Sequence, residues 1–227
     1  MRVDERSFSR GLLDDLANDG KEIGGLAVGI DPDQSQDDNY DGVDKATELR
    51  YYNIRNRAAR IAAKICQDHV GKEVVFMPVE TGGLRWWSDV TGCIDNSPSQ
   101  LSDVLYGSIN VKSYQKDKGW EPEMINGPSL SVENRDVILL EDIVDRGATL
   151  AFVKNYLLNH CSASGVEICT MLDRPSGRAP EFKDLKPDYV GFTVEGKDFL
   201  VGHGLDYNEH GRGLGDIYWI ADTKETA

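Results

Sequence analysis

Three carboxylates and a glycine turn lie close together near the middle of the chain. Glu141 and Asp142 follow the apolar run 137–140, and Asp145 comes just before a turn through Gly147. Four consecutive apolar residues suit a parallel strand covered on both faces, which places the acids at its carboxyl end, where open α/β sheets bind ligands. The turn then leads into a helix whose first backbone N–H groups can bind an anion. Because two carboxylates repel an anion unless a divalent cation lies between, the pattern predicts a phosphate site with Mg²⁺.

The same residues also allow a simpler interpretation. An ordinary strand-turn-helix unit can carry acids that only cap its helix. Leu150, Val153 and Leu157 follow the turn at helical spacing, which both interpretations share. The two adjacent acids ahead of the turn favour the phosphate site.

The elements that must position these residues belong to one domain of 227 residues, which is long enough to bury a sizeable core. The chain has 39 acidic residues against 25 lysines and arginines, a formal charge of −14, which disfavours nucleic acid and anionic membranes as partners. Its four cysteines have no paired short spacing, and no apolar stretch approaches membrane-spanning length. We therefore expect a reduced, cytoplasmic protein without structural zinc.

The N-terminal third contains two predicted helices. An amphipathic helix is expected over 4–19, followed by a strand over 26–30 and an exposed, solvated acidic loop over 31–44. A long helix is expected from about 44 to 70, with apolar residues at helical spacing. Its arginines lie on other faces and are expected to contact solvent or a partner subunit; they are Arg55, Arg57 and Arg60.

Further strands are predicted on either side of the central motif. The segment 73–79 resembles a buried strand and ends in a Gly-Gly turn, 80–83, that lets backbone N–H groups approach an anion. A strand is expected over 103–114, and the polar segment from there to 134 indicates a functional or a disordered connection. The remaining predicted strands are 165–172, 189–194, 199–202 and 217–221. This alternation predicts an α/β core of parallel strands with helices on both faces.

The central stretch Glu-Asp-Ile-Val-Asp, followed by Gly147 and Thr149, resembles the phosphoribosyl-diphosphate (PRPP) motif of type I phosphoribosyltransferases, in its hypoxanthine-guanine branch. The likeness spans about 73–220 and includes the stretches 172–178, 186–192 and 201–209. It implies a single domain over 1–227, with a core over about 44–180 and a hood built from 1–43 and 181–227. It also implies a mobile lid over about 113–134, with Ser113 and Tyr114 as its signature pair.

The resemblance implies a role for each part of the site. Asp145 is expected to act as the general base for N7 of a purine, and the 5′-phosphate is expected at Asp145, Arg146, Gly147, Ala148 and Thr149. Glu141 and Asp142 are expected to bind the ribose hydroxyls and one Mg²⁺, and Asp206 a second. Thr81, Gly82 and Arg212 are expected to bind pyrophosphate. The purine is expected against Ile143, Arg174, Phe199, Leu200 and Asp206.

Four positions depart from the family pattern. The family usually has a lysine where this chain has Thr81, so the pyrophosphate turn offers mainly backbone amides, with Arg85 as a further candidate. Arg146 and Ala148 stand in the phosphate turn where other residues are usual, although backbone donors survive such changes. Arg174 stands where the family reads the 6-oxo group with a lysine, and its guanidinium can donate to that oxygen.

These features favour a purine-salvage enzyme that transfers the phosphoribosyl group from PRPP to N9 of a 6-oxopurine. Guanine is the expected substrate, because the resemblance implies that backbone carbonyls near Leu200 and Asp206, with Asp198 close by, read the 2-position, and such acceptors suit a 2-amino group. The resemblance also implies a homodimer. The alternatives are a non-catalytic PRPP or nucleotide sensor of the same fold and a phosphoacceptor-like α/β regulator. The retained acids disfavour the first, and the long lid disfavours the second.

Overall fold

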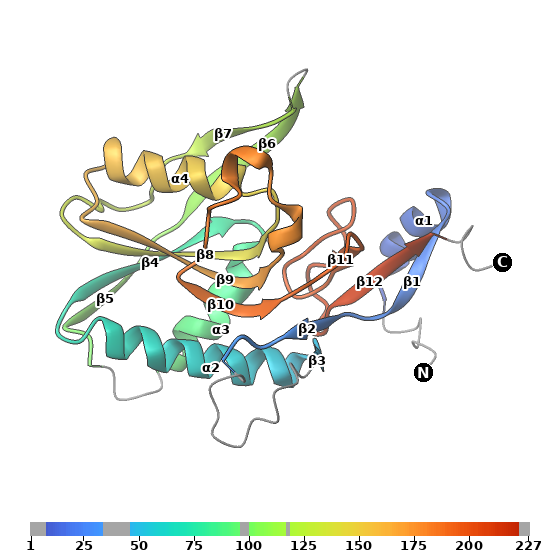
Figure 1. The fold of residues 1–227 in the computed structure, drawn as a ribbon, viewed down its shortest axis with the longest axis horizontal. Helices are drawn as coiled ribbons and strands as arrows, with labels where there is room; N and C mark the ends of the chain where they lie inside the picture. Colours follow the sequence, from blue (N-terminus) through green and yellow to red (C-terminus); the bar gives the residue numbers. More distant parts are fainter. Residues whose placement is uncertain (1–7, 34–45, 96–99, 117–118, 223–227) are drawn as a thin grey trace.

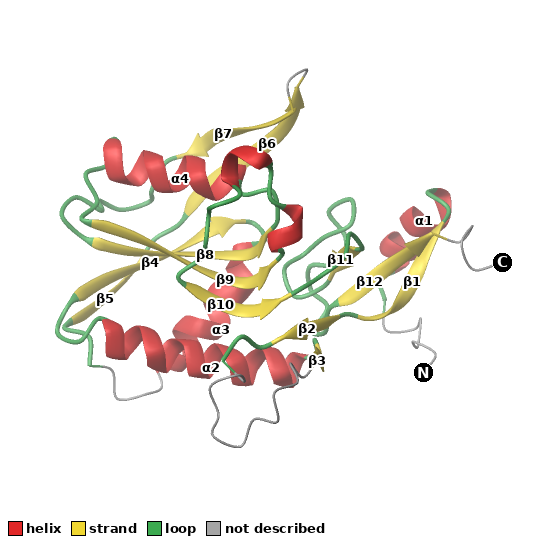
Figure 2. Ribbon diagram, viewed as in Figure 1, coloured by secondary structure: helices red, strands yellow, loops and turns green. Residues whose placement is uncertain are grey.

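The computed structural model describes residues 8–33, 46–95, 100–116 and 119–222. A large sheet forms the centre of the molecule, with helices above and below it, and a smaller sheet lies at one end (Figure 1). The same layers are visible when the chain is coloured by secondary structure (Figure 2). In the described part of the chain, no helix is long and apolar enough to cross a membrane.

The large sheet has the strand order β3-β2-β10-β9-β8-β4-β6-β7, and β5 also pairs with β4. Its centre is parallel, because β4 pairs in parallel with β5, β6 and β8, and β9 pairs in parallel with β8 and β10. The outer strands β2, β3 and β7 are antiparallel to their neighbours. The strands are β2 (Val28–Ile30), β3 (Ala46–Glu48), β4 (Glu73–Glu80), β5 (Asp103–Tyr106), β6 (Ile109–Lys116), β7 (Gly119–Asn126), β8 (Asp136–Val144), β9 (Gly165–Asp173) and β10 (Tyr189–Thr193).

Helices cover both faces of this sheet, as the alternating pattern predicted. The helices α2 (Tyr51–Asp68) and α3 (Gly83–Asp95) lie on one face, and α4 (Ala148–Asn159) lies on the other (Figure 1). Alternate residues of β4 point to opposite faces. Val74 and Phe76 belong to the core beneath α2 and α3, whereas Val75 and Met77 belong to the core beneath α4. Burial on both faces explains why the central strands are almost continuously apolar.

The two ends of the chain meet in a second sheet of order β1-β12-β11, built from β1 (Lys21–Leu26), β11 (Phe199–Val201) and β12 (Tyr218–Asp222). The helix α1 (Arg10–Asn18) packs on it through Leu12 and Leu16, which share a cluster with Val201 and Ile220. The Ser9 hydroxyl accepts from the Leu12 amide at 3.4 Å and caps this helix. The N-terminal segment therefore lies against the elements that follow residue 198.

Several predicted boundaries were wrong. The expected strand 26–30 is two strands in different sheets, because the chain passes from β1 to β2 at Ala27, whose amide bonds to the Ile217 carbonyl. The long helix begins at Tyr51, since β3 occupies 46–48. The expected strand 103–114 is two strands, β5 and β6, and the polar segment after it contains β7, so that β6 and β7 form an antiparallel hairpin.

The prediction that the α2 arginines face solvent or a partner was wrong for Arg57. Its side chain is 2% exposed and bonds to the carbonyls of Val190 and Gly191 at 2.6 and 2.8 Å. It also pairs with Asp31, whose side chain is 1% exposed. The first acid of the predicted solvated loop is therefore buried, because it neutralises an arginine from α2. The rest of that loop, 34–45, lies outside the described residues.

Candidate active site

The paired acids lie within β8, which continues past them to Val144. Glu141 is 8% exposed and Asp142 is half-buried. Burial, together with the negative charge of Asp142, raises the pKa of Glu141 well above its ordinary value of 4.5. Burial also raises the pKa of Asp142. Both carboxylates line one cavity, so the site concentrates negative charge that a cation would relieve.

The turn after β8 bends through Gly147, the N-cap of α4, at φ 89°. This left-handed conformation favours glycine. A Cβ there would also lie 3.0 Å from Cβ of Phe182. The turn 145–149 and the acids line the same cavity, of about 430 Å³, together with the turn after β4. The first N–H groups of α4 lack partners within the helix, so this end of the cavity suits a phosphate. Arg146 is exposed at its rim.

A smaller cavity of about 230 Å³ adjoins the first, and Asp142, Ile143, Asp145 and Asp206 line both. Arg174, Phe199, Leu200 and Leu205 complete the smaller one. Nη1 of Arg174 lies 3.7 Å from Oδ2 of Asp145, and its buried Nε has no hydrogen-bond partner among the described residues. A hydrogen-bond donor and a carboxylate thus stand side by side at the wall of this cavity.

Phe199 is 49% exposed at the smaller cavity, and its ring meets that of Tyr207 edge to face, with centroids 5.4 Å apart. The Tyr207 hydroxyl donates to Asp19. Asp198 is exposed and does not line this cavity, contrary to the expectation that its charge lies near the 2-position of a purine. Its backbone carbonyl instead accepts from Nη2 of Arg174 at 2.8 Å, just before β11 begins.

The turn after β4 and the loop 203–215 contact each other at the part of the cavity where the sequence predicted pyrophosphate to bind. A Cβ on Gly204 would lie 2.5 Å from the Gly82 carbonyl oxygen, so only glycine permits this contact. Arg212 donates from Nη1 to the Gly204 carbonyl at 2.8 Å and pairs with Asp206 at 2.6 Å. Thr81 is exposed beside them. Arg85 does not line the cavity, because its guanidinium lies over the Tyr51 ring, 5.7 Å from the centroid.

Acidic side chains outnumber basic ones in the lining of the larger cavity. Five carboxylates line it, from Glu80, Glu141, Asp142, Asp145 and Asp206, against the guanidinium groups of Arg146 and Arg212. Among the described residues, no three His, Cys, Asp or Glu side chains form a group that could hold a metal ion. Mg²⁺ is commonly bound by one or two carboxylates with water and substrate oxygens, so the adjacent Glu141 and Asp142 fit it when a phosphate ligand is present.

Ser113 and Tyr114 belong to β6, where they pair with Pro122 and Glu121 of β7. Their side chains, with all those from 113 to 120, fall outside the described part of the structure. The predicted lid signature therefore sits on a two-stranded hairpin. This hairpin continues from Val111, which lines the larger cavity.

Comparison with known proteins identifies the family. The phosphoribosyl transferase domain matches residues 49–210. Hypoxanthine-guanine phosphoribosyltransferase of Bacillus subtilis is 34% identical over 163 residues, which cover 71% of this chain and 84% of that protein. The chain belongs to the hypoxanthine-guanine phosphoribosyltransferase family. The protein of the same name from Lactococcus lactis is 33% identical over 178 residues, covering 76% of this chain and 90% of its own.

Solved structures of this phosphoribosyltransferase family have the same fold. A hypoxanthine phosphoribosyltransferase from Staphylococcus aureus has a TM-score of 0.67 and 31% identity, covering 76% of this chain and 89% of its own. A hypoxanthine-guanine phosphoribosyltransferase from Bacillus anthracis has a TM-score of 0.68 and 25% identity, covering 88% and 99%. The chain therefore has the type I phosphoribosyltransferase fold, as the sequence indicated.

One residue that organises this site, Arg178, has no role that the sequence pattern predicts. Nη1 of Arg178 donates to three carbonyls, those of Val144, Asp145 and Arg174, with 2.7 Å to Asp145 and 3.2 Å to Arg174. Nη2 pairs with Asp173, and the Arg178 side chain is 4% exposed. One buried guanidinium thus joins the turn after β8 to the turn after β9. Its position within Arg-Pro-Ser-Gly-Arg was the only available signal, and no spacing rule predicts carbonyl partners about 33 residues away.

Proposed function

We propose that this protein is a purine-salvage phosphoribosyltransferase that joins a 6-oxopurine, through N9, to the ribose of PRPP and releases pyrophosphate. The observation that supports it best is the pair formed by Arg174, at the smaller cavity, and Asp145, which lines both cavities. The smaller cavity has room for a base, and the larger one has the phosphate turn. The shared wall is where the two substrates would meet.

The Arg174–Asp145 pair is complementary to one edge of a 6-oxopurine. Such an edge presents the O6 acceptor beside N7. Arg174 supplies donors for O6, and the Asp145 carboxylate accepts the proton from N7 as the bond at N9 forms. Adenine presents an amino group at C6, which would place donors against the Arg174 donors in a buried site. We therefore expect adenine to be excluded.

The larger cavity provides for PRPP. The N–H groups of 145–149, with the Thr149 hydroxyl, bind the 5′-phosphate, and Glu141 and Asp142 bind the ribose hydroxyls. Thr81, Gly82 and Arg212 bind pyrophosphate, with Arg212 neutralising the oxygens that leave. Mg²⁺ held by Glu141 and Asp142, with a second ion near Asp206, supplies charge neutralisation between these acids and the phosphates.

We propose that guanine is the preferred base. Ile143 and Leu200 line the base cavity, and Phe199 offers a half-exposed ring for stacking. Carbonyl acceptors near Leu200 and Asp206 suit the 2-amino group of guanine, which hypoxanthine lacks and which xanthine replaces with an oxygen. Because the Asp198 carboxylate lies outside the cavity, this preference rests on backbone acceptors alone. One unmet buried acceptor costs about 1–3 kcal/mol, or roughly ten- to a hundredfold in kcat/KM.

Two further proposals concern assembly and closure. The hairpin of β6 and β7 acts as a lid over 113–134 that excludes water from the reacting centre, with Ser113 and Tyr114 closing on the substrates.

The protein acts as a homodimer, for which light scattering at micromolar concentration is the test. A monomeric mass would contradict the dimer.

The deciding experiment mixes the protein with PRPP, Mg²⁺ and one base at a time and measures nucleotide formation. We expect guanine to react fastest, hypoxanthine at least about tenfold more slowly in kcat/KM, xanthine poorly and adenine not at all. Equal values for guanine and hypoxanthine would contradict the preference but not the reaction. Binding of PRPP without nucleotide from any base would instead favour the sensor.

A further inference from the structure

A buried histidine and aspartate connect the loop 203–215 to the core. His203 is completely buried, and its Nε2 lies 2.6 Å from Oδ2 of Asp89 in α3. Its Nδ1 lies 2.8 Å from the Gly215 carbonyl oxygen. The other Asp89 oxygen accepts from Arg55 of α2 at 3.0 Å. Each ring nitrogen therefore faces a hydrogen-bond acceptor, one a backbone carbonyl and the other a carboxylate.

Neighbouring groups stabilise the ionised form of Asp89. Burial opposes it, but the hydrogen bond and charge of His203, followed by those of Arg55, lower the pKa of Asp89 below its ordinary value of 3.8. The remaining side of the His203 ring faces the Tyr51 ring, with centroids 5.9 Å apart. The described groups around this imidazole thus include one carboxylate and one guanidinium, on two different helices.

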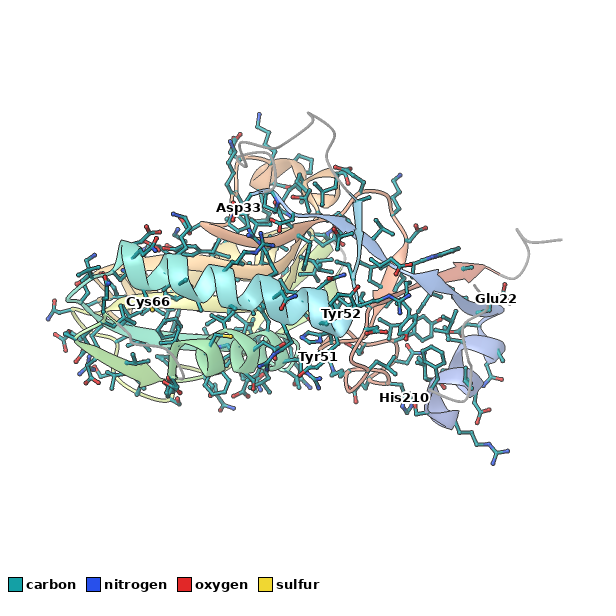
Figure 3. The ribbon with its side chains drawn as sticks, turned by 90° about the horizontal axis from the view of Figure 1, so that it is seen from below. Glu22, Asp33, Tyr51, Tyr52, Cys66 and His210 are labelled. Atoms are coloured by element: carbon teal, nitrogen blue, oxygen red, sulfur yellow. The ribbon has the colours of Figure 1, made fainter. Side chains whose placement is uncertain are left out.

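His203 stands at the neck of a closed loop. Its amide bonds to the Leu214 carbonyl at 2.9 Å, and the Gly204 amide bonds to the Arg212 carbonyl at 3.0 Å. The loop between these bonds carries Asp206 and Arg212, which line the larger cavity. The far side of the loop lies against α1, where a Cβ on Gly11 would touch the His210 ring at 2.7 Å. Figure 3 shows His210 beside α1 and Tyr51 at the start of α2.

We propose that His203 is a positioning residue, which, paired with Asp89, holds the loop 203–215 against the turn after β4 so that Arg212 faces pyrophosphate. This inference rests on the proposed function. Its physical reason is the charge of the cavity, in which five carboxylates oppose two guanidinium groups. Thr81 is uncharged, so on the pyrophosphate side of the cavity Arg212 is the residue that supplies positive charge. A small shift of its loop would therefore remove a large share of the electrostatic attraction for pyrophosphate.

The test compares binding of two ligands to the wild-type protein and to variants, by calorimetry with Mg²⁺ present. His203→Gln keeps a donor for Asp89 but loses the Gly215 contact, and Asp89→Asn removes the charge of the pair. We expect both to weaken pyrophosphate binding about tenfold, the cost of one charged hydrogen bond. GMP binding should change much less, since Arg178 holds the turns that bind its phosphate and base edge.

Two further variants keep the test decisive if the buried substitutions fail to fold. Arg55→Gln removes the outer partner of Asp89, and its side chain is 44% exposed, so it should fold and weaken pyrophosphate binding to a smaller degree. Lys64→Gln removes a surface ion pair on the same helix and should leave both affinities unchanged.

The possible results separate this inference from the proposed function. Variants that are less stable but bind pyrophosphate as the wild type does would show that the pair is only a core contact. A selective loss of pyrophosphate binding in a protein that makes no nucleotide would support the positioning role and overturn the proposed reaction. Failure of the wild type to bind either ligand would overturn both.

Discussion

The sharpest prediction concerns Gly177, which ends a short 3₁₀ helix, Pro175–Gly177, beside the turn after β8. A Cβ at this position would lie 1.6 Å from Oδ1 of Asp145 and 2.9 Å from its Cγ. Real Cβ atoms essentially never approach within 3.0 Å, so the overlap is roughly 1.4 Å. The Asp145 side chain is 42% exposed and can rotate, so Gly177→Ala should displace the carboxylate and leave the fold intact.

The expected effect is on catalysis rather than on stability. A displacement of about 1 Å in a reacting group costs up to roughly 10²-fold, so we expect kcat to fall about 10²-fold, equivalent to about 2.7 kcal/mol. The φ angle of Gly177 lies outside the left-handed region, so an alanine should not strain the backbone. The melting temperature should therefore stay close to that of the wild type.

The assay is steady-state nucleotide formation from PRPP and guanine, with thermal unfolding measured in parallel. Gly92→Ala is the matched control, because its Cβ would meet nothing within 4 Å and should leave kcat unchanged. A Gly177→Ala protein with kcat within about twofold of wild type would refute the reasoning. If kcat of Gly177→Ala were unchanged but Asp145→Asn were inactive in the same assay, we would conclude that the carboxylate acts in the reaction and that it relaxes around the new methyl group.

Three other predictions follow from the same site. Asp145→Asn should lower kcat by ~10²–10⁴-fold while weakening GMP binding far less, and a nearly unchanged kcat would assign the proton to another group. Gly82→Ala would place a Cβ 2.0 Å from Oδ2 of Asp142, so the Mg²⁺ concentration for half-maximal activity should rise about tenfold, which a magnesium titration would check. Burial raises the pKa of Glu141 above 4.5. Without metal, the folded state therefore binds more protons than the unfolded state at pH values between 4.5 and the raised pKa. The free energy of unfolding then falls as pH rises through that window. The gain in melting temperature from Mg²⁺ over EDTA should therefore increase with pH, and an equal gain from about pH 5 to about pH 8 would contradict this account.

The sequence by itself determined the central motif and the class of the fold. The acids and the glycine turn lie within nine residues, and the apolar run before them has the length of a buried strand, so their geometry depends on local backbone preferences. Gly147 at φ 89° and the start of α4 at Ala148 agree with that pattern. The strand after Gly165 and the parallel core followed from the same periodicity.

Only the tertiary structure decided which distant groups meet. Arg57 was predicted to face solvent or a partner but neutralises the buried Asp31, and Asp198 turned out to orient Arg174 through its carbonyl rather than to line the base cavity. His203 and Asp89 are 114 residues apart. Such contacts depend on strand order and on the path of loops, because a charged side chain forms hydrogen bonds or ion pairs with whichever group the packing brings near. Local pattern therefore predicts where a donor or acid lies along the chain, and only the packed fold determines its partner.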